Sequence, residues 1–208
     1  IFKYFDRANQ LIPFSNKHQV IQSTNSRDLK GYFRKTNPHI KFTSEENNKG
    51  RQFLERLGMN SLDRFVCLIV RDSAYKEKYQ KWNNRDWSYH NYRDSDIDTY
   101  EEAILALVEK GYWVFRVGKA VHKPLKIKHS RVIDYANTPY RSDFLDMWLM
   151  ANCFFCISNG TGLDEVSIVF RKPVIKSNFV PMLYMNSYSN CITIVTCELI
   201  NFSSDSQP

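Results

Sequence analysis

A short run of small residues is the strongest candidate in this sequence for binding an anion. It lies between an apolar segment and a helical pattern, so we expect a tight strand-to-helix turn. Small residues let backbone N–H groups approach a phosphate, and the following helix presents the positive end of its dipole. The candidates for contacting a diphosphate are therefore the residues of this turn, Ser158, Asn159, Gly160, Thr161 and Gly162. The alternative is an ordinary turn in which glycine supplies a positive φ and the threonine caps the helix.

This turn matches neither of two well-known phosphate-binding patterns. Gly160-Thr161-Gly162 lacks the third glycine of the dinucleotide-binding fingerprint. It also lacks the Gly-Lys-Ser/Thr ending of a P-loop. The sequence therefore argues against a nicotinamide-dependent enzyme and against an ATPase.

Arginines supply the second candidate group for the same ligand. Arg71 and Arg116 follow predicted strands, and Arg93 lies in a loop before a predicted helix. A guanidinium makes bidentate contacts with phosphate oxygens. We expect these arginines to neutralise a diphosphate without a metal ion and without a bound cofactor. The alternative is that they are solvated charges at the edges of the sheet.

The segment 88–97 concentrates aromatic, imidazole, guanidinium and carboxylate groups within ten residues. His90 is a candidate general base or phosphate ligand because its intrinsic pKa lies nearest neutrality. Asp94 is the second candidate catalytic residue, and the alternative for His90 is an inert surface histidine. Asp94-Ser95-Asp96 resembles the Asp-x-Asp metal motif of single-domain glycosyltransferases, but Asp96 is more simply the N-cap of the next helix.

Two further residues are candidates for contacting a ribose or a sugar. Tyr75 follows the first predicted strand, and Glu165 lies in the first turn of the helix after the glycine turn. A carboxylate there can accept hydrogen bonds from sugar hydroxyls. It can equally interact with the helix dipole alone.

Apolar runs and helical patterns alternate along most of the chain. We predict strands at 65–70, 112–117, 131–134, 153–157, from 173, and at 192–195, and helices at 44–57, 99–110, from 142, and at 163–170. Thr43 and Glu46 have the spacing of a capping box, and Gly111 suits a left-handed helix C-cap. The segment 73–96 is expected to be a long loop.

Buried strands that alternate with helices predict an α/β fold, a Rossmann-like doubly wound and mainly parallel sheet. Ligands of such sheets bind outside the carboxyl ends of the strands, where the candidate residues lie. We assign residues 43–208 to this domain and residues 1–42 to a connector or the remnant of an N-terminal domain. The chain begins with Ile1 rather than Met, so we expect a processed start or a piece of a longer polypeptide.

The formal net charge of +7 favours an anionic partner, which is either a phosphorylated small molecule or a nucleic acid. The basic residues are spread over the chain rather than gathered in a tail, so a nucleic-acid partner is disfavoured. Cys153 and Cys156 lie in an apolar run and are interpreted as core packing. Five cysteines without a disulfide framework are typical of a reduced, cytosolic protein. No apolar run approaches about 20 residues, although the aromatic and basic residues permit a peripheral contact with the inner membrane.

The joined motifs resemble one known family. They are Val70-Arg71-Asp72-Ser73-x-Tyr75, Tyr89-His90-Asn91-Tyr92-Arg93-Asp94-Ser95-Asp96-Ile97, Gly111-Tyr112-x-Val114-x-Arg116-x-Gly118, Asp134-Tyr135-Ala136, Ser142-Asp143-Phe144-Leu145-Asp146 and Phe170-x-Lys172-Pro173. Between about residues 60 and 182 the chain resembles bacterial glycosyltransferases found in surface-polysaccharide gene clusters.

The resemblance implies a two-domain fold of the GT-B type, in which the C-terminal half binds a nucleotide sugar and the N-terminal half supplies most of the acceptor site. The acceptor would be a glycan or a lipid-linked molecule. A broader similarity to the donor-binding halves of fucosyltransferases places Arg71 or Arg116 on the phosphates. Two other functions stay open: a sugar-nucleotide epimerase or other phosphate-ligand enzyme on the same scaffold, and a nucleic-acid-binding module with a basic, aromatic-rich loop.

Overall fold

Six strands form one sheet in the computed structural model, which describes residues 7–15, 31–79, 88–179 and 191–194. The strands are β1 (Phe65–Ile69), β2 (Trp113–Arg116), β3 (Val132–Ile133), β4 (Phe155–Ser158), β5 (Val174–Ser177) and β6 (Cys191–Ile194). Residues 7–10 are helical, and the α-helices that follow are α2 (Tyr32–Lys35), α3 (Ser44–Arg56), α4 (Ala74–Tyr79), α5 (Glu101–Glu109), α6 (Asp143–Asn152) and α7 (Asp164–Val169). Three 3-10 helices are described, η3 (Ser88–Arg93), η4 (Ile97–Tyr100) and η5 (Tyr135–Asn137).

The sheet has the strand order β3-β2-β1-β4-β5-β6, and each pair of neighbouring strands runs parallel. This is the strand order of the Rossmann fold. The predicted α/β class is therefore confirmed, and within the described strands the sheet is wholly rather than mainly parallel. From β1 the chain adds β2 and β3 on one side, and it then adds β4, β5 and β6 on the other side, so the topological switch point lies between β1 and β4.

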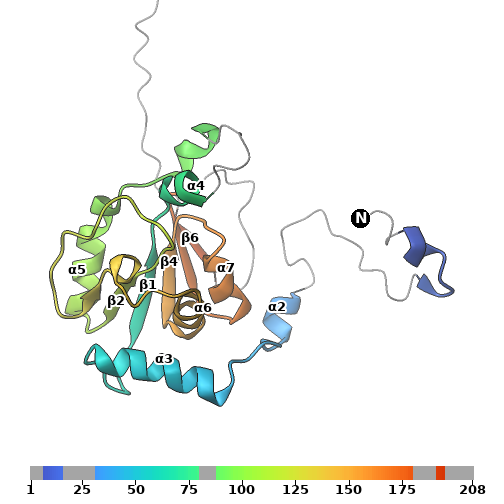
Figure 1. Cartoon of the computed structure of the whole chain (residues 1–208), viewed down its shortest axis with the longest axis horizontal. Helices are drawn as coiled ribbons and strands as arrows, with labels where there is room; N and C mark the ends of the chain where they lie inside the picture. The colour runs from blue at the N-terminus through green and yellow to red at the C-terminus, as the bar shows by residue number, and fades with distance from the viewer. Residues whose placement is uncertain (1–6, 16–30, 80–87, 180–190, 195–208) are drawn as a thin grey trace, which may run out of the picture.

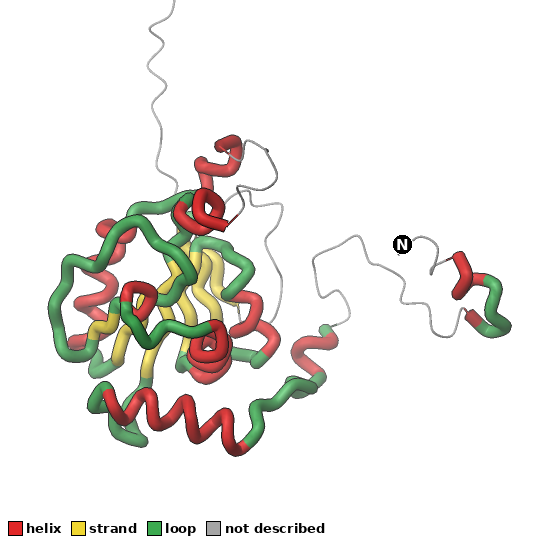
Figure 2. Tube along the Cα trace, in the orientation of Figure 1, coloured by secondary structure: helices red, strands yellow, loops and turns green. Residues whose placement is uncertain are grey.

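The alternation of side chains along each strand explains why β1 is a continuous apolar run. Cys67 and Ile69 point into a core with α3, α6 and α7, whereas Leu68 and Val70 point into a second core with α5. Figure 1 and Figure 2 show the strands in the middle of the molecule with these helices around them. Both faces of the central strands are covered, which is the condition for a doubly wound parallel sheet.

The helix signals in the sequence are confirmed. Thr43 and Glu46 form the reciprocal capping box of α3, in which the threonine side chain accepts the Glu46 N–H. The Ser142 side chain accepts the Leu145 N–H at the start of α6. Gly111 has a φ of 88°, and Asp96 is the N-cap of η4, which leads directly into α5.

Two expectations about elements were wrong. The segment 73–96 is not simply a loop, because it contains α4 and η3. The Asp72 carboxylate accepts the Ala74 N–H at 3.0 Å, and this local bond begins α4. Cys153 is the C-cap of α6 rather than a strand residue, since its N–H still donates to the carbonyl of Leu149. Cys153 and Cys156 are both free and buried in the core.

Part of the segment before residue 43 packs against the domain. The Phe42 ring stacks on Phe170 with centroids 5.4 Å apart, and the Arg171 guanidinium lies 4.2 Å from the centre of the Phe33 ring. The boundary between residues 42 and 43 stays a prediction, and residues 16–30 lie outside the described part. Across the described residues, no helix combines the length and apolar character needed to cross a bilayer.

Candidate functional site

Asn159 joins the loops at the switch point of the sheet. Its side-chain oxygen accepts the backbone N–H of Arg71 at 2.8 Å, and its side-chain nitrogen donates to the Ser95 hydroxyl at 3.1 Å and the Arg93 carbonyl at 3.3 Å. Asn159 is 1% exposed. This buried amide fixes the end of β1, the end of β4 and the segment 93–95 to one another.

Four charged side chains gather beside this junction, and we call them the cationic cluster: Arg71, Lys76, Arg93 and Asp94. Arg71 Nε lies 3.1 Å from Asp94 Oδ1, with 12% and 19% of the two side chains exposed. The Arg93 guanidinium donates to the carbonyl of Gly160 at 3.2 Å. In the described part of the chain, Lys76 Nζ and Arg93 Nε are shielded from solvent without a hydrogen-bond partner.

The charges of this cluster do not balance. Burial, followed by the positive charge of Arg93, lowers the pKa of Arg71. Burial, followed by the charge of Arg71, lowers the pKa of Lys76. Burial raises the pKa of Asp94, and the nearby cations only partly oppose this. The charge of Asp72 also acts on Asp94, but three cationic groups against these two carboxylates still leave an excess of positive charge among the described side chains. Such an excess attracts an anion.

The glycine turn lies directly beside the cluster. Gly160 has a φ of 86°, and a Cβ atom there would lie 2.6 Å from the Phe179 ring. The Gly160 N–H donates to the Ser158 hydroxyl at 3.1 Å, and the Thr161 N–H points to Asp164 Oδ2 at 3.4 Å. Two of the N–H groups expected to face a phosphate therefore have protein partners. Thr161 is not a helix cap, because the N-cap of α7 is Leu163.

A buried ion pair lies next to this turn, and the sequence analysis did not identify it. Lys176 Nζ is 3.5 Å from Asp164 Oδ2, with 3% and 0% of the two side chains exposed. Lys176 belongs to β5 and pairs in register with Ser158. The alternation of side chains along a strand could have predicted this burial, because Lys176 lies two residues after the buried Val174 and therefore on the same face of β5.

Arg116 has a different environment from the predicted one. Its side chain is 1% exposed, and its guanidinium donates to the Lys123 carbonyl at 2.7 Å and to Asp134 at 3.2 Å. The guanidinium therefore holds the loop after β2 instead of facing outward at the strand end. This burial differs from the outward-facing arginine expected at a strand end, and a contact of Arg116 with a diphosphate stays a prediction.

The other predicted residues lie on three separate helices. Tyr75 is 43% exposed on α4, and its ring lies 5.2 Å from that of Tyr79. Glu165 lies on α7 with Oε1 3.8 Å from Lys176 Nζ. His90 belongs to η3, but its side chain lies outside what the structure describes. Their roles stay predictions.

The two carboxylates of the Asp94-Ser95-Asp96 motif point to different cations. Asp94 contacts Arg71, whereas Asp96 Oδ2 lies 2.6 Å from Lys123 Nζ. Among the described residues, no three His, Cys, Asp or Glu side chains are grouped in a way that could hold a metal ion.

Comparison with known proteins gives relatives by structure and none by sequence. No family model and no curated protein match the sequence. The glycosyl transferase family 9 protein from Veillonella parvula DSM 2008 aligns with a TM-score of 0.52 and 13% identity, over 76% of this chain and 42% of that one. The E. coli ADP-heptose LPS heptosyltransferase II aligns with a TM-score of 0.47 and 13% identity, over 76% of this chain and 45% of that one.

The first likeness shows the fold. The chain shares the α/β architecture of the Veillonella parvula protein and spans less than half of the length of either neighbour. The resemblance of the motifs to surface-polysaccharide glycosyltransferases stays a prediction, because no comparison by sequence supports it.

Proposed function

We propose that this chain is the donor-binding half of a glycosyltransferase that moves a sugar from a nucleotide-activated donor to a surface glycan or a lipid-linked acceptor. The observation that carries the proposal is the excess positive charge of the cationic cluster at the switch point between β1 and β4. Open parallel sheets bind their ligands at this point. The shared fold of a glycosyltransferase neighbour supports the same choice of reaction.

The cationic cluster would act on the leaving group. When the bond from the sugar to the donor phosphate breaks, negative charge accumulates on the departing nucleoside diphosphate. Arg71 and Arg93 would contact its oxygens with their planar guanidinium groups, and Lys76 would contribute a point charge. Cations that are already in place stabilise this charge without reorganisation. In this proposal side chains, rather than a metal ion, neutralise the diphosphate.

The acceptor hydroxyl must lose its proton during the transfer. Asp94 and His90 are the proposed bases. Burial raises the pKa of Asp94, which makes its carboxylate a stronger base, and the ion pair with Arg71 holds it beside the proposed diphosphate position. Tyr75 and Glu165 are the proposed contacts to the ribose or the sugar. We place the reaction in the cytoplasm, with a lipid-linked acceptor drawing the protein to the surface of the inner membrane.

A turnover assay tests the proposal. The full chain is incubated with a panel of nucleotide sugars and a lipid-linked glycan acceptor, and the released nucleoside diphosphate is measured. The double variant Arg71→Gln/Arg93→Gln should lose at least about 100-fold in rate, because each charge-assisted hydrogen bond contributes about 1.5–3 kcal/mol. Arg51→Gln, at an exposed position on α3, is the matched control and should keep the wild-type rate. A double variant as active as the wild type would overturn the proposal.

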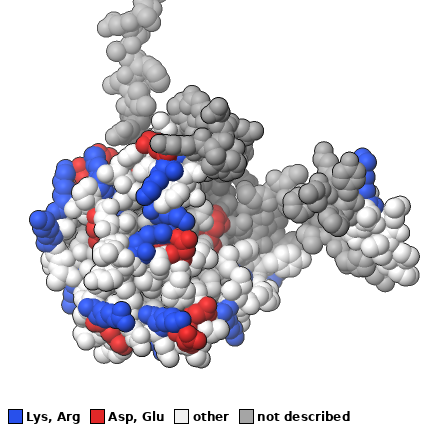
Figure 3. Space-filling model, in the orientation of Figure 1, with Lys and Arg blue, Asp and Glu red and all other residues white. Residues whose placement is uncertain are grey.

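The same assay separates the competing functions. An epimerase would change the sugar without releasing the nucleotide and without an acceptor. A nucleic-acid-binding module would bind oligonucleotides with a steep salt dependence and would show no preference among nucleotide sugars. Figure 3 shows basic side chains next to acidic ones at several places on the visible face.

A further inference from the structure

A second polar site lies beside α4, and none of the residues of the cationic cluster lines it. It is an open hollow of about 370 Å³ between α4, the loop after β2 and η5. Its lining residues are Ala74, Glu77, Lys78, Lys119, Ala120, Val121, His122, Ala136 and Asn137. We call it the α4 hollow. None of its lining residues was among the site residues predicted from the sequence.

The geometry of α4 separates the two sites. Ala74, Glu77 and Lys78 line the hollow, and positions i, i+3 and i+4 share one face of a helix. Lys76 lies on a different face, where its charge interacts with Arg71 and Asp94. Asp72 is directed toward the hollow, since its Oδ2 accepts the backbone N–H of His122 at 2.9 Å. Two adjacent residues after β1 therefore belong to different sites. Arg71 belongs to the cationic cluster, and Asp72 belongs to the α4 hollow.

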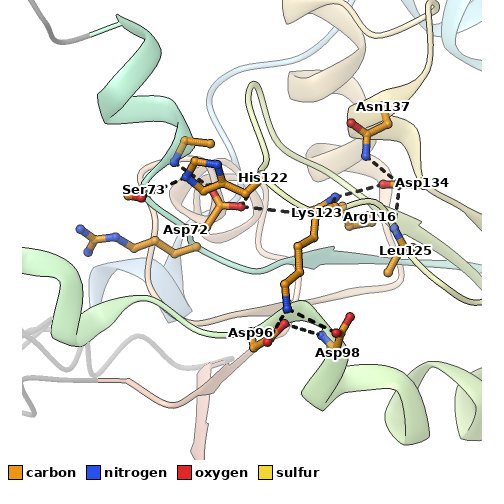
Figure 4. Close-up of polar contacts among 12 residues, drawn as sticks. Asp72, Ser73, Asp96, Asp98, Arg116, His122, Lys123, Leu125, Asp134 and Asn137 are labelled. Atoms are coloured by element: carbon orange, nitrogen blue, oxygen red, sulfur yellow. Dashed lines mark hydrogen bonds and ion pairs between the residues drawn. The ribbon is translucent and has the colours of Figure 1, made fainter.

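The loop that forms one wall of the hollow is held by three separate contacts (Figure 4). Asp72 accepts the His122 N–H, Asp134 accepts the Leu125 N–H at 3.0 Å, and the buried Arg116 donates to the Lys123 carbonyl. Because these contacts fix the backbone of the loop, the hollow exists before a ligand arrives. Preformed walls lower the entropic cost of binding.

The chemistry of the lining suits hydroxyl groups. Glu77 Oε1 lies 2.5 Å from the Ser73 hydroxyl and 3.4 Å from His122 Nε2, and Ser73 lies 3.1 Å from the same imidazole nitrogen. A carboxylate accepts hydrogen bonds, while ammonium and amide groups such as those of Lys78, Lys119 and Asn137 donate them. Alanines at three lining positions leave room for a ring. A flat heterocyclic base, by contrast, favours an apolar pocket, which this open and polar hollow is not.

We propose that the α4 hollow binds a sugar ring through its vicinal hydroxyls, with Glu77 as the principal acceptor. The inference rests on the proposed function, because a diphosphate at the cationic cluster carries a sugar ring at each end. The ring is therefore either the ribose of the nucleotide or the sugar to be transferred. Both offer the same diol chemistry to Glu77.

Calorimetric titration of the full chain tests this assignment. The probes are inorganic pyrophosphate, which has no ring, the ribonucleoside diphosphates ADP, GDP, UDP and CDP with their 2′-deoxy forms, and glucose 1-phosphate. The variants are Glu77→Gln, which weakens the acceptor, and Ala120→Leu, which fills the hollow. Glu102→Gln, at an exposed position on α5, is the matched control.

We expect both hollow variants to bind pyrophosphate as the wild type does and to bind at least one ring-bearing probe about tenfold more weakly. Glu77→Gln loses a charge-assisted hydrogen bond, and Ala120→Leu takes the space of the ring. The hollow is assigned to the ribose if two results are found together. The hollow variants lose affinity for ribonucleoside diphosphates, and the wild type binds the 2′-deoxy forms only weakly. Loss of affinity for glucose 1-phosphate alone assigns it to the transferred sugar.

The outcomes separate this inference from the proposed function. If every ring-bearing probe binds Glu77→Gln and Ala120→Leu as tightly as the wild type, the inference is overturned, whatever pyrophosphate does. If pyrophosphate fails to bind the wild type but ring-bearing probes respond to the hollow variants, the α4 hollow stands and the diphosphate site falls. If no probe binds the wild type, both are overturned.

Discussion

At the scale of single residues, the buried Asn159 side chain holds the backbone of Arg71 and of Arg93 together at the switch point between β1 and β4. Arg71, Arg93 and Asn159 were predicted from their place after strands or in the preceding loop, and they do meet at the switch point. Arg116 was predicted by the same argument, yet it is buried. Position after a strand fixes which edge of the sheet a residue occupies, but not whether its guanidinium faces the solvent or the loop beneath.

The backbone at Gly160 gives a direct test of the turn. Gly160→Ala should lower the free energy of unfolding by about 1–3 kcal/mol, because it forces a side chain into a left-handed φ and against the Phe179 ring. Gly162→Ala is the control, since a Cβ there meets nothing within 4 Å. Urea denaturation measures both. Equal stabilities of the two variants would contradict the described turn.

The buried pair of Asp164 and Lys176 predicts strong coupling. Lys176→Met should cost about 3–5 kcal/mol of unfolding free energy, because it leaves the Asp164 carboxylate buried without its cation. The double variant Asp164→Asn/Lys176→Met should recover much of that loss. Lys49→Met breaks the exposed pair between Lys49 and Glu45 and should leave the stability close to that of the wild type. Additive effects in a double-mutant cycle at 164 and 176 would show that the pair is not formed.

The lowered pKa of Lys76 predicts a pH dependence of anion binding. Its ammonium loses its proton at a lower pH than an ordinary lysine, whose pKa is about 10.4, so one positive charge of the cluster disappears in the alkaline range. Nucleoside diphosphates suit this measurement, because a terminal phosphate with a pKa near 6 is fully ionised there. As the pH rises, affinity should begin to fall at a lower pH than the titration of an ordinary lysine would give, and Lys76→Arg should move the fall to higher pH. An identical profile for the variant would rule out this role of Lys76.

At the scale of elements, the strands and most helices followed from hydrophobic runs and caps, whereas α4 did not. Its six residues carry no apolar stripe, and the Asp72 carboxylate that begins it looked like one more polar loop residue. Because α4 was missed, so were Lys76 on one of its faces and the α4 hollow on another. Short polar helices that depend on a single cap give a weak signal in sequence.

Asp72 should therefore stabilise two elements at once. Asp72→Ala removes the acceptor of the Ala74 and His122 N–H groups, so we expect a loss of about 1–2 kcal/mol and faster hydrogen exchange in α4 and at residues 120–123. Asp63→Ala removes a comparable acceptor, that of the Asn60 N–H, at a distant turn. Hydrogen exchange in α4 of the Asp63→Ala variant should therefore match that of the wild type. Unchanged exchange in Asp72→Ala would mean that the loop is held by other contacts.

At the scale of the whole molecule, the architecture was predictable because both cores impose the same pattern on every central strand. The function is less predictable from the sequence, because a Rossmann-like sheet serves many chemistries and only the residues at the switch point distinguish them. The chain also spans only 42% of its structural neighbour from Veillonella parvula. The acceptor site is thus a proposal drawn from the resemblance, whereas donor binding is a property that this chain can be tested for directly.

Thermal stabilisation by nucleoside diphosphates and nucleotide sugars is the most direct test of the central claim. A ligand present at about 100 times its Kd should add about 2.7 kcal/mol to the unfolding free energy. We predict a clear rise in Tm with one nucleotide for the wild type and Arg51→Gln, and none for Arg71→Gln/Arg93→Gln. A rise of equal size in the double variant, or no rise with any nucleotide in the wild type, would contradict a donor site at the cationic cluster.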